Sequence, residues 1–232
     1  MEICRGFTDQ DWRYLRSQLE KGQEEAWRIA VNVFERRIRE RFLACIETLI
    51  AADTKPDLKG PAPKVGPDSG GNSGEVIPGF AIMALCCLLV ETIQSFIDGR
   101  FRERGTAKGG DDSPERTETT PSTAGAFKRF LRRGGFKGEF KRLEYDFTEK
   151  VRHGLLHDAE TRDWIIWREQ PRGQIVAQRG NEHVLNRTDF YEALMGEFEA
   201  YLKELRDPDQ CERRKNFVRK MDSICQYQPD IQ

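Results

Sequence analysis

The chain has 232 residues, which is enough for one principal domain with its own hydrophobic core, or for one domain and a small appendage. Charged residues make up 33% of the chain and hydrophobic residues 38%, and the mean hydropathy is −0.71. This composition indicates a soluble protein with a heavily charged surface. The formal net charge of −1 excludes a global positive field for nucleic acid, so any basic surface must be local.

We expect neither a signal peptide nor a membrane span. Charged residues such as Arg5, Asp9 and Arg13 interrupt the start of the chain, which has no apolar region typical of a leader. The longest uncharged apolar stretch, 76–90, is shorter than the roughly 20 residues that cross a bilayer, and a buried core helix explains it better. These features predict a cytoplasmic protein without a membrane partner.

The cysteines indicate reduced thiols. None of them forms a CxxC pair, and two are adjacent within the apolar stretch, so we expect them to pack as small hydrophobic side chains. We predict no structural zinc site and no cofactor. The six cysteines are Cys4, Cys45, Cys86, Cys87, Cys211 and Cys225.

Helical periodicity dominates the first third of the chain. Thr8 or Asp9 is a suitable cap for a first helix that ends at Leu19, and a longer helix is predicted from Gly22 to about Ile50. Apolar residues recur at helical spacing along this second helix. They are Ile29, Val33, Ile38, Phe42, Cys45, Ile46 and Leu49.

A third helix is predicted from Pro78 to Asp98, with Gly99 closing it. It is apolar nearly all round, so we expect it to be the core helix. Two tracts rich in glycine, proline and polar residues, 53–76 and 103–123, are predicted to be mobile loops. The inward residues expected on the core helix are Ile82, Leu85, Cys86, Leu89, Ile93, Phe96 and Ile97.

Helices are predicted next over 126–133 and 140–156, separated by Gly134-Gly135. The period then changes from helix to strand, which predicts a β-hairpin or a three-stranded ribbon inserted at 163–186. The strands expected there are 164–167, 174–177 and 183–185.

The last part of the chain is predicted to be helical again. Asn186 or Thr188 is a suitable cap for a helix through Leu205, and Pro208 opens a basic helix to about Cys225. The fold class is therefore mainly α with a minor β insertion. The predicted organisation is an N-terminal helix at 1–21, a main helical domain at 22–206, and a basic C-terminal helix and tail at 207–232.

Two of the three histidines lie within the six-residue motif Arg152-His153-Gly154-Leu155-Leu156-His157. Histidine exchanges protons near neutral pH, and arginine binds phosphate through two parallel hydrogen bonds, so the motif suits phosphodiester chemistry. On a regular helix His153 and His157 share a face, whereas Arg152 stands about 140° from His157. We expect Arg152 and His157 to meet only through the reach of the arginine, a helix end or a second subunit.

Two other interpretations of the motif stay open. In one, it is a helix C-terminus where His157 binds free carbonyl groups and Gly154 accommodates close packing. In the other, Glu149, His153 and His157 begin a metal site, since they repeat at four-residue spacing. The HExxH pattern is absent and no further histidine cluster completes such a site, so we predict no metal.

Basic side chains concentrate just before the motif. They can bind RNA phosphates or form an ordinary solvated face, and the phenylalanines among them are expected in the core rather than stacked on bases. The basic residues are Lys128, Arg129, Arg132, Arg133, Lys137, Lys141 and Arg142, and the phenylalanines are Phe127, Phe130, Phe136 and Phe140. A second basic cluster contains Arg213, Arg214, Lys215, Arg219 and Lys220.

Glu91 lies in the apolar core helix. A carboxylate in such a position needs a cationic or hydrogen-bonding partner, and Arg152, His153 or His157 would be suitable. Alternatively, Glu91 marks the exit of the helix into solvent.

The six-residue motif resembles the signature of HEPN domains, in which an arginine and a polar residue precede a histidine. HEPN domains are all-α ribonucleases of bacterial toxin–antitoxin and phage-defence systems. The runs 88–99 and 151–161, and the hairpin followed by a helix, are similar to one subgroup of bacterial HEPN-like proteins. The resemblance covers roughly residues 33–205 without the two polar loops, and it implies an antiparallel helical bundle.

The resemblance also implies a metal-independent endoribonuclease that works as a homodimer and leaves a cyclic phosphate, with an antitoxin or a defence protein as a partner. His157 would be the general acid or base, Arg152 would stabilise negative charge on the phosphate, and His153 would orient the RNA. Ala159 stands where HEPN toxins modified by nucleotidyltransferases carry a tyrosine, so that form of regulation is not expected. The alternative is a non-catalytic HEPN-like module that binds RNA, a nucleotide or a protein.

Overall fold

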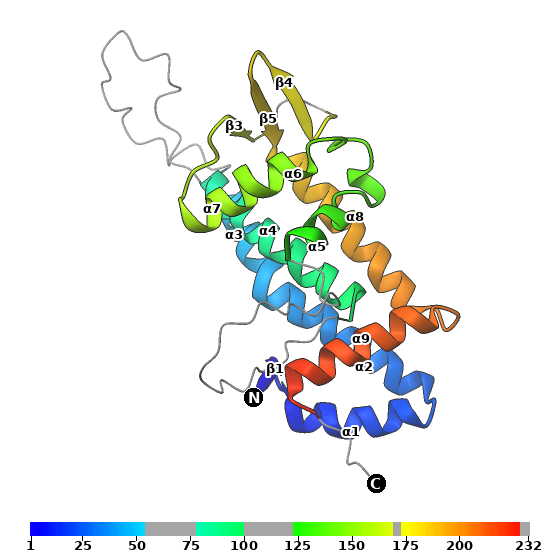
Figure 1. Cartoon of the computed structure of the whole chain (residues 1–232). Helices are drawn as coiled ribbons and strands as arrows, with labels where there is room; N and C mark the ends of the chain where they lie inside the picture. Colours follow the sequence, from blue (N-terminus) through cyan, green and yellow to red (C-terminus); the bar gives the residue numbers. More distant parts are fainter. Residues whose placement is uncertain (54–77, 100–122, 169–172, 228–232) are drawn as a thin grey trace, which may run out of the picture.

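The computed structural model describes residues 1–53, 78–99, 123–168 and 173–227, and it is mainly helical with a small three-stranded sheet (Figure 1). Its first elements are β1 (Glu2–Cys4), β2 (Phe7–Thr8), α1 (Asp9–Glu20), α2 (Glu24–Ile38), the π-helical turn η1 (Arg39–Leu43), α3 (Ala44–Asp53), α4 (Pro78–Ile97) and α5 (Thr123–Phe130). They are followed by the short 3-10 turn η3 (Gly134–Phe136), α6 (Glu144–Phe147), the π-helical turn η4 (Thr148–His153), α7 (Gly154–His157), β3 (Trp164–Trp167), β4 (Val176–Arg179), β5 (Glu182–Asn186), α8 (Arg187–Arg206) and α9 (Cys211–Cys225).

The two tracts predicted as mobile loops lie outside the described residues, except at their borders. Asp53 is the last residue of α3, and Thr123 is the first residue of α5.

A capping box starts α1. The Thr8 side chain accepts a hydrogen bond from the Asp11 backbone N–H at 3.3 Å, and the Asp11 carboxylate accepts one from the Thr8 N–H at 2.7 Å. The choice of Thr8 as a cap is therefore confirmed. The short β1–β2 hairpin before it was not predicted, because strands of two or three residues are too short to show an alternating pattern.

The predicted second helix contains the π-helical turn η1 at its centre. A π turn adds one residue to the helix, so the buried stripe changes phase, and Leu43 becomes buried where Phe42 was expected. The expected stripe was wrong at Cys45, which is exposed after this phase change. It was also wrong at Ile29, which is 41% exposed because α2 turns another face towards the core.

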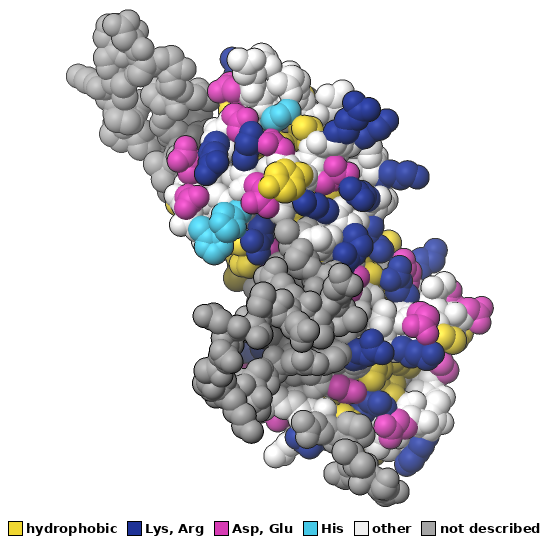
Figure 2. Space-filling view, in the orientation of Figure 1, with side chains coloured by type: hydrophobic (Ala, Val, Ile, Leu, Met, Phe, Trp, Pro, Cys, Tyr) yellow, Lys and Arg dark blue, Asp and Glu magenta, His cyan; other side chains and the backbone are white. Residues whose placement is uncertain are grey.

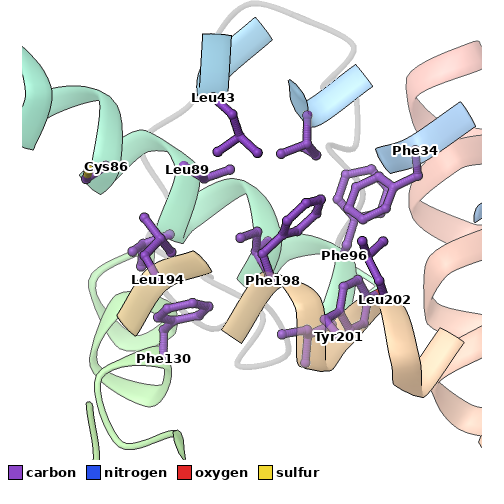
Figure 3. Packing of buried hydrophobic residues seen from close by; sticks show 14 of the residues in the cluster. Phe34, Leu43, Cys86, Leu89, Phe96, Phe130, Leu194, Phe198, Tyr201 and Leu202 are labelled. Carbon is purple, nitrogen blue, oxygen red and sulfur yellow. The ribbon is translucent and has the colours of Figure 1, made fainter. Parts of the chain in front are cut away.

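Helix α4 lies at the centre of the core (Figure 3) and contacts α3, α5, α8 and α9. Phe96 packs against Phe34 at a centroid distance of 4.4 Å and against Phe217 at 5.8 Å. Among the described helices, Gly79–Ile97 alone is long and apolar enough to cross a membrane, but its side chains are largely buried among the other helices. The prediction of a core helix is confirmed.

The phenylalanines of the basic segment are part of the core, as predicted, because all four are buried: Phe127, Phe130, Phe136 and Phe140. Phe136 packs against Phe190 of α8 at 5.0 Å between ring centroids. The predicted helix over 126–133 ends at Phe130, and turns follow it.

At the break between the two predicted helices, the Gly134-Gly135 backbone packs closely against a buried carboxylate of α8. Glu197 is only 6% exposed, accepts a hydrogen bond from the Gly135 N–H at 3.1 Å and pairs with Arg133 at 3.2 Å. A Cβ atom at Gly134, whose φ is +23°, would overlap the Glu197 carboxylate. Glycine is therefore required for this approach of backbone to side chain.

The small sheet has the strand order β3-β5-β4. The β4–β5 hairpin was predicted, although β4 begins two residues later than expected, at Val176. The parallel pairing of β3 with β5 was not predicted, because strand direction depends on the path of the intervening chain. Asn186 then caps α8 by accepting hydrogen bonds from the Thr188 and Asp189 N–H groups at 3.1 and 3.2 Å, as predicted.

The first and last helices share the hydrophobic core with the central ones. Trp12 of α1 and Phe217 of α9 are fully buried members of the same cluster, and their ring centroids lie 6.3 Å apart. The Trp12 indole N–H also donates to Asp222 of α9 at 2.8 Å. These contacts hold α1 and α9 side by side, at the end of the molecule away from the small sheet (Figure 1).

We expect a thiol reagent to modify Cys45 and Cys211 in the folded protein and to leave the other cysteines unmodified. Cys45 and Cys211 are exposed, whereas burial raises the pKa of the Cys86 and Cys225 thiols to about 12 and so suppresses the reactive thiolate. Mass spectrometry after a brief iodoacetamide pulse measures this pattern, and a urea-unfolded sample is the control. Rapid labelling of Cys86 in the native protein would contradict the described core.

Candidate functional site

The motif lies at the end of an irregular helix formed by α6, η4 and α7. The helix was predicted to begin at Phe140 but begins at Glu144, because positive φ angles at Gly138 (+98°) and Arg142 (+69°) break the chain direction first. The π-helical turn η4 includes Arg152 and His153. The 140° estimate assumed a regular α-helix, so it does not hold across this turn.

The two histidines of the motif are exposed and adjacent. Their ring centroids lie 4.3 Å apart at an angle of 41°, so His153 and His157 share one face, as predicted. Figure 2 shows histidine side chains gathered at the surface beside lysine and arginine. Among the described residues, no side chain hydrogen-bonds or ion-pairs with either imidazole, and the predicted contact of His157 with helix carbonyls is not formed.

Arg152 is held by Glu91 of the core helix. Its Nε donates a short hydrogen bond to Glu91 Oε1, and the two side chains are 18% and 19% exposed. The expectation that Glu91 has a cationic partner is confirmed. The guanidinium donates no other hydrogen bond to a described residue, so its terminal NH₂ groups remain available to a ligand.

On the side of the core helix, the surroundings of this ion pair are apolar. Cys87 is fully buried there, and its pKa is raised well above the ordinary value, mainly by burial. The opposite charges of Arg152 and Glu91 attract more strongly next to buried, apolar surroundings than in open water. This attraction favours a fixed position for Arg152.

Lys150 links the π-helical turn η4 to the segment before β3 through ion pairs. Its ammonium pairs with Asp146 and with Asp163, both at 2.8 Å, and these hydrogen bonds raise the pKa of Lys150. Asp146 also accepts a hydrogen bond from the Trp164 indole at 2.8 Å. This role of Lys150 was not predicted, although its four-residue spacing from Asp146 is typical of an ion pair on one helix face.

Gly154 allows the chain to fold back over the end of the helix. Its carbonyl accepts hydrogen bonds from the N–H groups of Asp158 at 2.8 Å and Glu160 at 3.3 Å. A Cβ atom at this position would overlap the Glu160 carbonyl oxygen. The packing role proposed for Gly154 is confirmed, and it places His157 on the last turn before the chain reverses.

The metal interpretation of the motif receives no geometric support. Within the described ranges, no three His, Cys, Asp or Glu side chains are arranged to hold a metal ion.

The basic cluster is divided between structural and exposed residues. Arg129 pairs with Asp98 at 2.6 Å, Arg132 with Glu144 at 3.0 Å, and Arg133 with the buried Glu197, while Lys128 lies over the Tyr145 ring at 4.3 Å. The remaining three cluster members are exposed and form no ion pair with any described residue. They are Lys137, Lys141 and Arg142.

Comparison of the chain with protein-family profiles, curated proteins and solved structures finds no match in any of the three.

We predict that Gly154→Ala lowers the free energy of unfolding by about 1–3 kcal/mol, because the new methyl group must displace the Glu160 backbone. Gly196→Ala is the matched control: it lies in α8 with open space around its Cβ position, and helix propensity predicts a gain of about 0.5–1 kcal/mol. Urea denaturation followed by circular dichroism measures both values. Equal effects of the two substitutions would contradict the close approach at Gly154.

Proposed function

We propose that the chain is a HEPN-like, metal-independent endoribonuclease that acts in bacterial defence or in a toxin–antitoxin pair. The proposal is carried by one observation: an exposed histidine pair, His153 and His157, follows in the chain directly after an arginine that a carboxylate of the core helix holds in place. The resemblance of the motif to the HEPN signature adds to this support.

The proposed reaction is an attack of the RNA 2′-hydroxyl on its own phosphate. The 2′-oxygen forms a bond to phosphorus and the bond to the 5′-oxygen breaks, which leaves a 2′,3′-cyclic phosphate and a 5′-hydroxyl. One group must accept the 2′-hydroxyl proton and one must donate a proton to the leaving oxygen. His157 takes one of these roles, and His153 orients the RNA or assists proton transfer.

Arg152 stabilises the negative charge that develops on the phosphate during this attack. Because its Nε binds Glu91, the guanidinium is already oriented, and its two terminal NH₂ groups can contact two phosphate oxygens. This orientation lowers the entropic cost of binding the transition state.

In this proposal the protein works as a homodimer in the cytoplasm, and the two motifs face each other across one RNA-binding cleft. The exposed Lys137, Lys141 and Arg142 contact RNA phosphates at the edge of that cleft. The other members of the basic cluster contribute mainly to the fold.

A non-catalytic HEPN-like binding module is the second candidate. The ion pairs of Arg129, Arg132 and Arg133 reduce the positive charge available to RNA, so for such a module they favour a nucleotide or a protein as the ligand. Such a module would bind RNA, a nucleotide or a protein partner without cleavage.

Cleavage of total RNA in EDTA tests the proposal. We expect the wild-type protein to produce cyclic phosphate ends, and we expect His157→Ala to lower the rate by about 100-fold or more, as removal of a general acid or base does. Glu149→Ala is the control on the same helix, and its rate should stay unchanged because the reaction uses no metal at this carboxylate.

Three outcomes distinguish the alternatives. Equal cleavage by wild type and His157→Ala would indicate another site or a contaminant. Loss of cleavage in EDTA together with sensitivity to Glu149→Ala would indicate a metal site. RNA binding without cleavage by any variant would favour the binding module.

We predict that Glu91→Gln lowers the cleavage rate about tenfold, equivalent to ~1.4 kcal/mol of barrier, because Arg152 loses its charged anchor. The neutral amide still accepts a hydrogen bond, so the free energy of unfolding should change by no more than about 1.5 kcal/mol. Glu199→Gln, an exposed carboxylate on α8, is the control. If Glu91→Gln changes stability but not the cleavage rate of the folded protein, the ion pair is structural only.

A further inference from the structure

A cavity is lined by residues of α1, α2 and α9 and of the turn between α1 and α2. Helices α1 and α9 lie at the end of the molecule away from α7 (Figure 1). Its volume is about 560 Å³, which falls within the range of small-molecule sites. The Arg152 motif contributes no residue to its walls, so the cavity is separate from the proposed ribonuclease site.

Part of the cavity wall is apolar and aromatic. Leu19, Trp27, Val218 and Tyr227 line it, and the Trp27 ring is fixed by a hydrogen bond from its indole N–H to the Leu205 carbonyl. Aromatic and aliphatic side chains in a concave wall favour a flat apolar group.

The rest of the wall carries an excess of positive charge. Its four cations are Arg16, Arg214, Lys215 and Arg219, and its two carboxylates are Glu24 and Asp222. The wall therefore holds two more positive than negative groups. These cations include part of the second basic cluster of the sequence, which has no role in the proposed cleavage reaction.

Two of these cations are fixed within the fold. Arg214 pairs with Glu24 at 2.7 Å and lies over the Trp27 ring at 4.6 Å, while Arg16 pairs with Asp222 at 3.2 Å. The Asp222 side chain is only 18% exposed, and this burial raises its pKa.

The other two cations are available to a ligand. Arg219 is exposed and forms no ion pair with a described residue. Within the described part of the chain, Lys215 pairs with Glu212 alone, and these side chains are 68% and 79% exposed, so water competes strongly with the pair. An incoming anion can bind both cations without breaking a buried interaction.

We propose that this cavity binds a small organic anion, in which a carboxylate, sulfonate or phosphate is attached to a flat apolar body. Arg219 and Lys215 bind the anionic group, and the flat body lies against Leu19 and Val218. The site does not depend on ribonuclease activity, so its test is a binding measurement.

Fluorescence titration with anilinonaphthalene sulfonate, a flat organic anion, tests the site. We expect saturable binding that Arg219→Glu weakens at least about tenfold, because a charge-assisted contact is replaced by repulsion. Lys203→Glu is the matched control: it makes the same charge change on an exposed position of α8 outside the cavity. Val218→Trp, which fills the cavity, should also weaken binding, and thermal melting confirms that each variant is folded.

Two further probes separate the contributions of the anionic group and of the apolar body to the binding affinity. Uncharged N-phenylnaphthylamine should bind more weakly than the sulfonate, and pyrophosphate should compete with the sulfonate. No saturable binding, equal weakening by Arg219→Glu and Lys203→Glu, or equal affinity for the neutral probe would each overturn the proposal.

Discussion

The packing of the apolar helix α4 against its neighbours organises the whole molecule, because more than half of its apolar stretch is buried. An apolar helix of this length must be covered, and α3, α5, α8 and α9 cover it, with Phe96 packed between rings of α2 and α9. Glu91 is a carboxylate on this same helix, and its cost of burial is offset by Arg152. The core helix and the candidate site are thus coupled: the position of Arg152 follows from the packing of α4.

Irregular helical turns occur where the structure has to change phase. The turn η1 moves Leu43 into the core, and the turn η4 contains Arg152 and His153. π-Helical turns are often found at functional sites, because one extra residue redirects side chains that a regular helix would place elsewhere. Gly154 then lets the following chain return over the helix end, which leaves the histidine pair exposed at a defined surface.

Most of the arginines that the structure describes have partners within the fold, and this separates arginines that stabilise the fold from those of a candidate binding surface. Arg133 neutralises the buried Glu197, and Arg214 bridges α2 and α9 through Glu24 and Trp27. The cations left without such partners among the described residues, notably Lys137 and Arg219, mark two different surfaces. Lys137 lies in the turns before α6, and Arg219 lines the cavity beside α1.

The helical class, the core helix, the caps at Thr8 and Asn186, and the shared face of His153 and His157 could all be predicted from the order of the residues alone. These features depend on neighbours within a few residues, where spacing and local hydrogen bonds decide the outcome. The π-helical turns and the parallel β3–β5 pair could not be predicted in this way. Neither could the choice of Arg152 as the partner of Glu91, nor the set of basic residues that form ion pairs. Each of these joins segments distant in sequence or responds to packing, and periodicity carries no information about such partners.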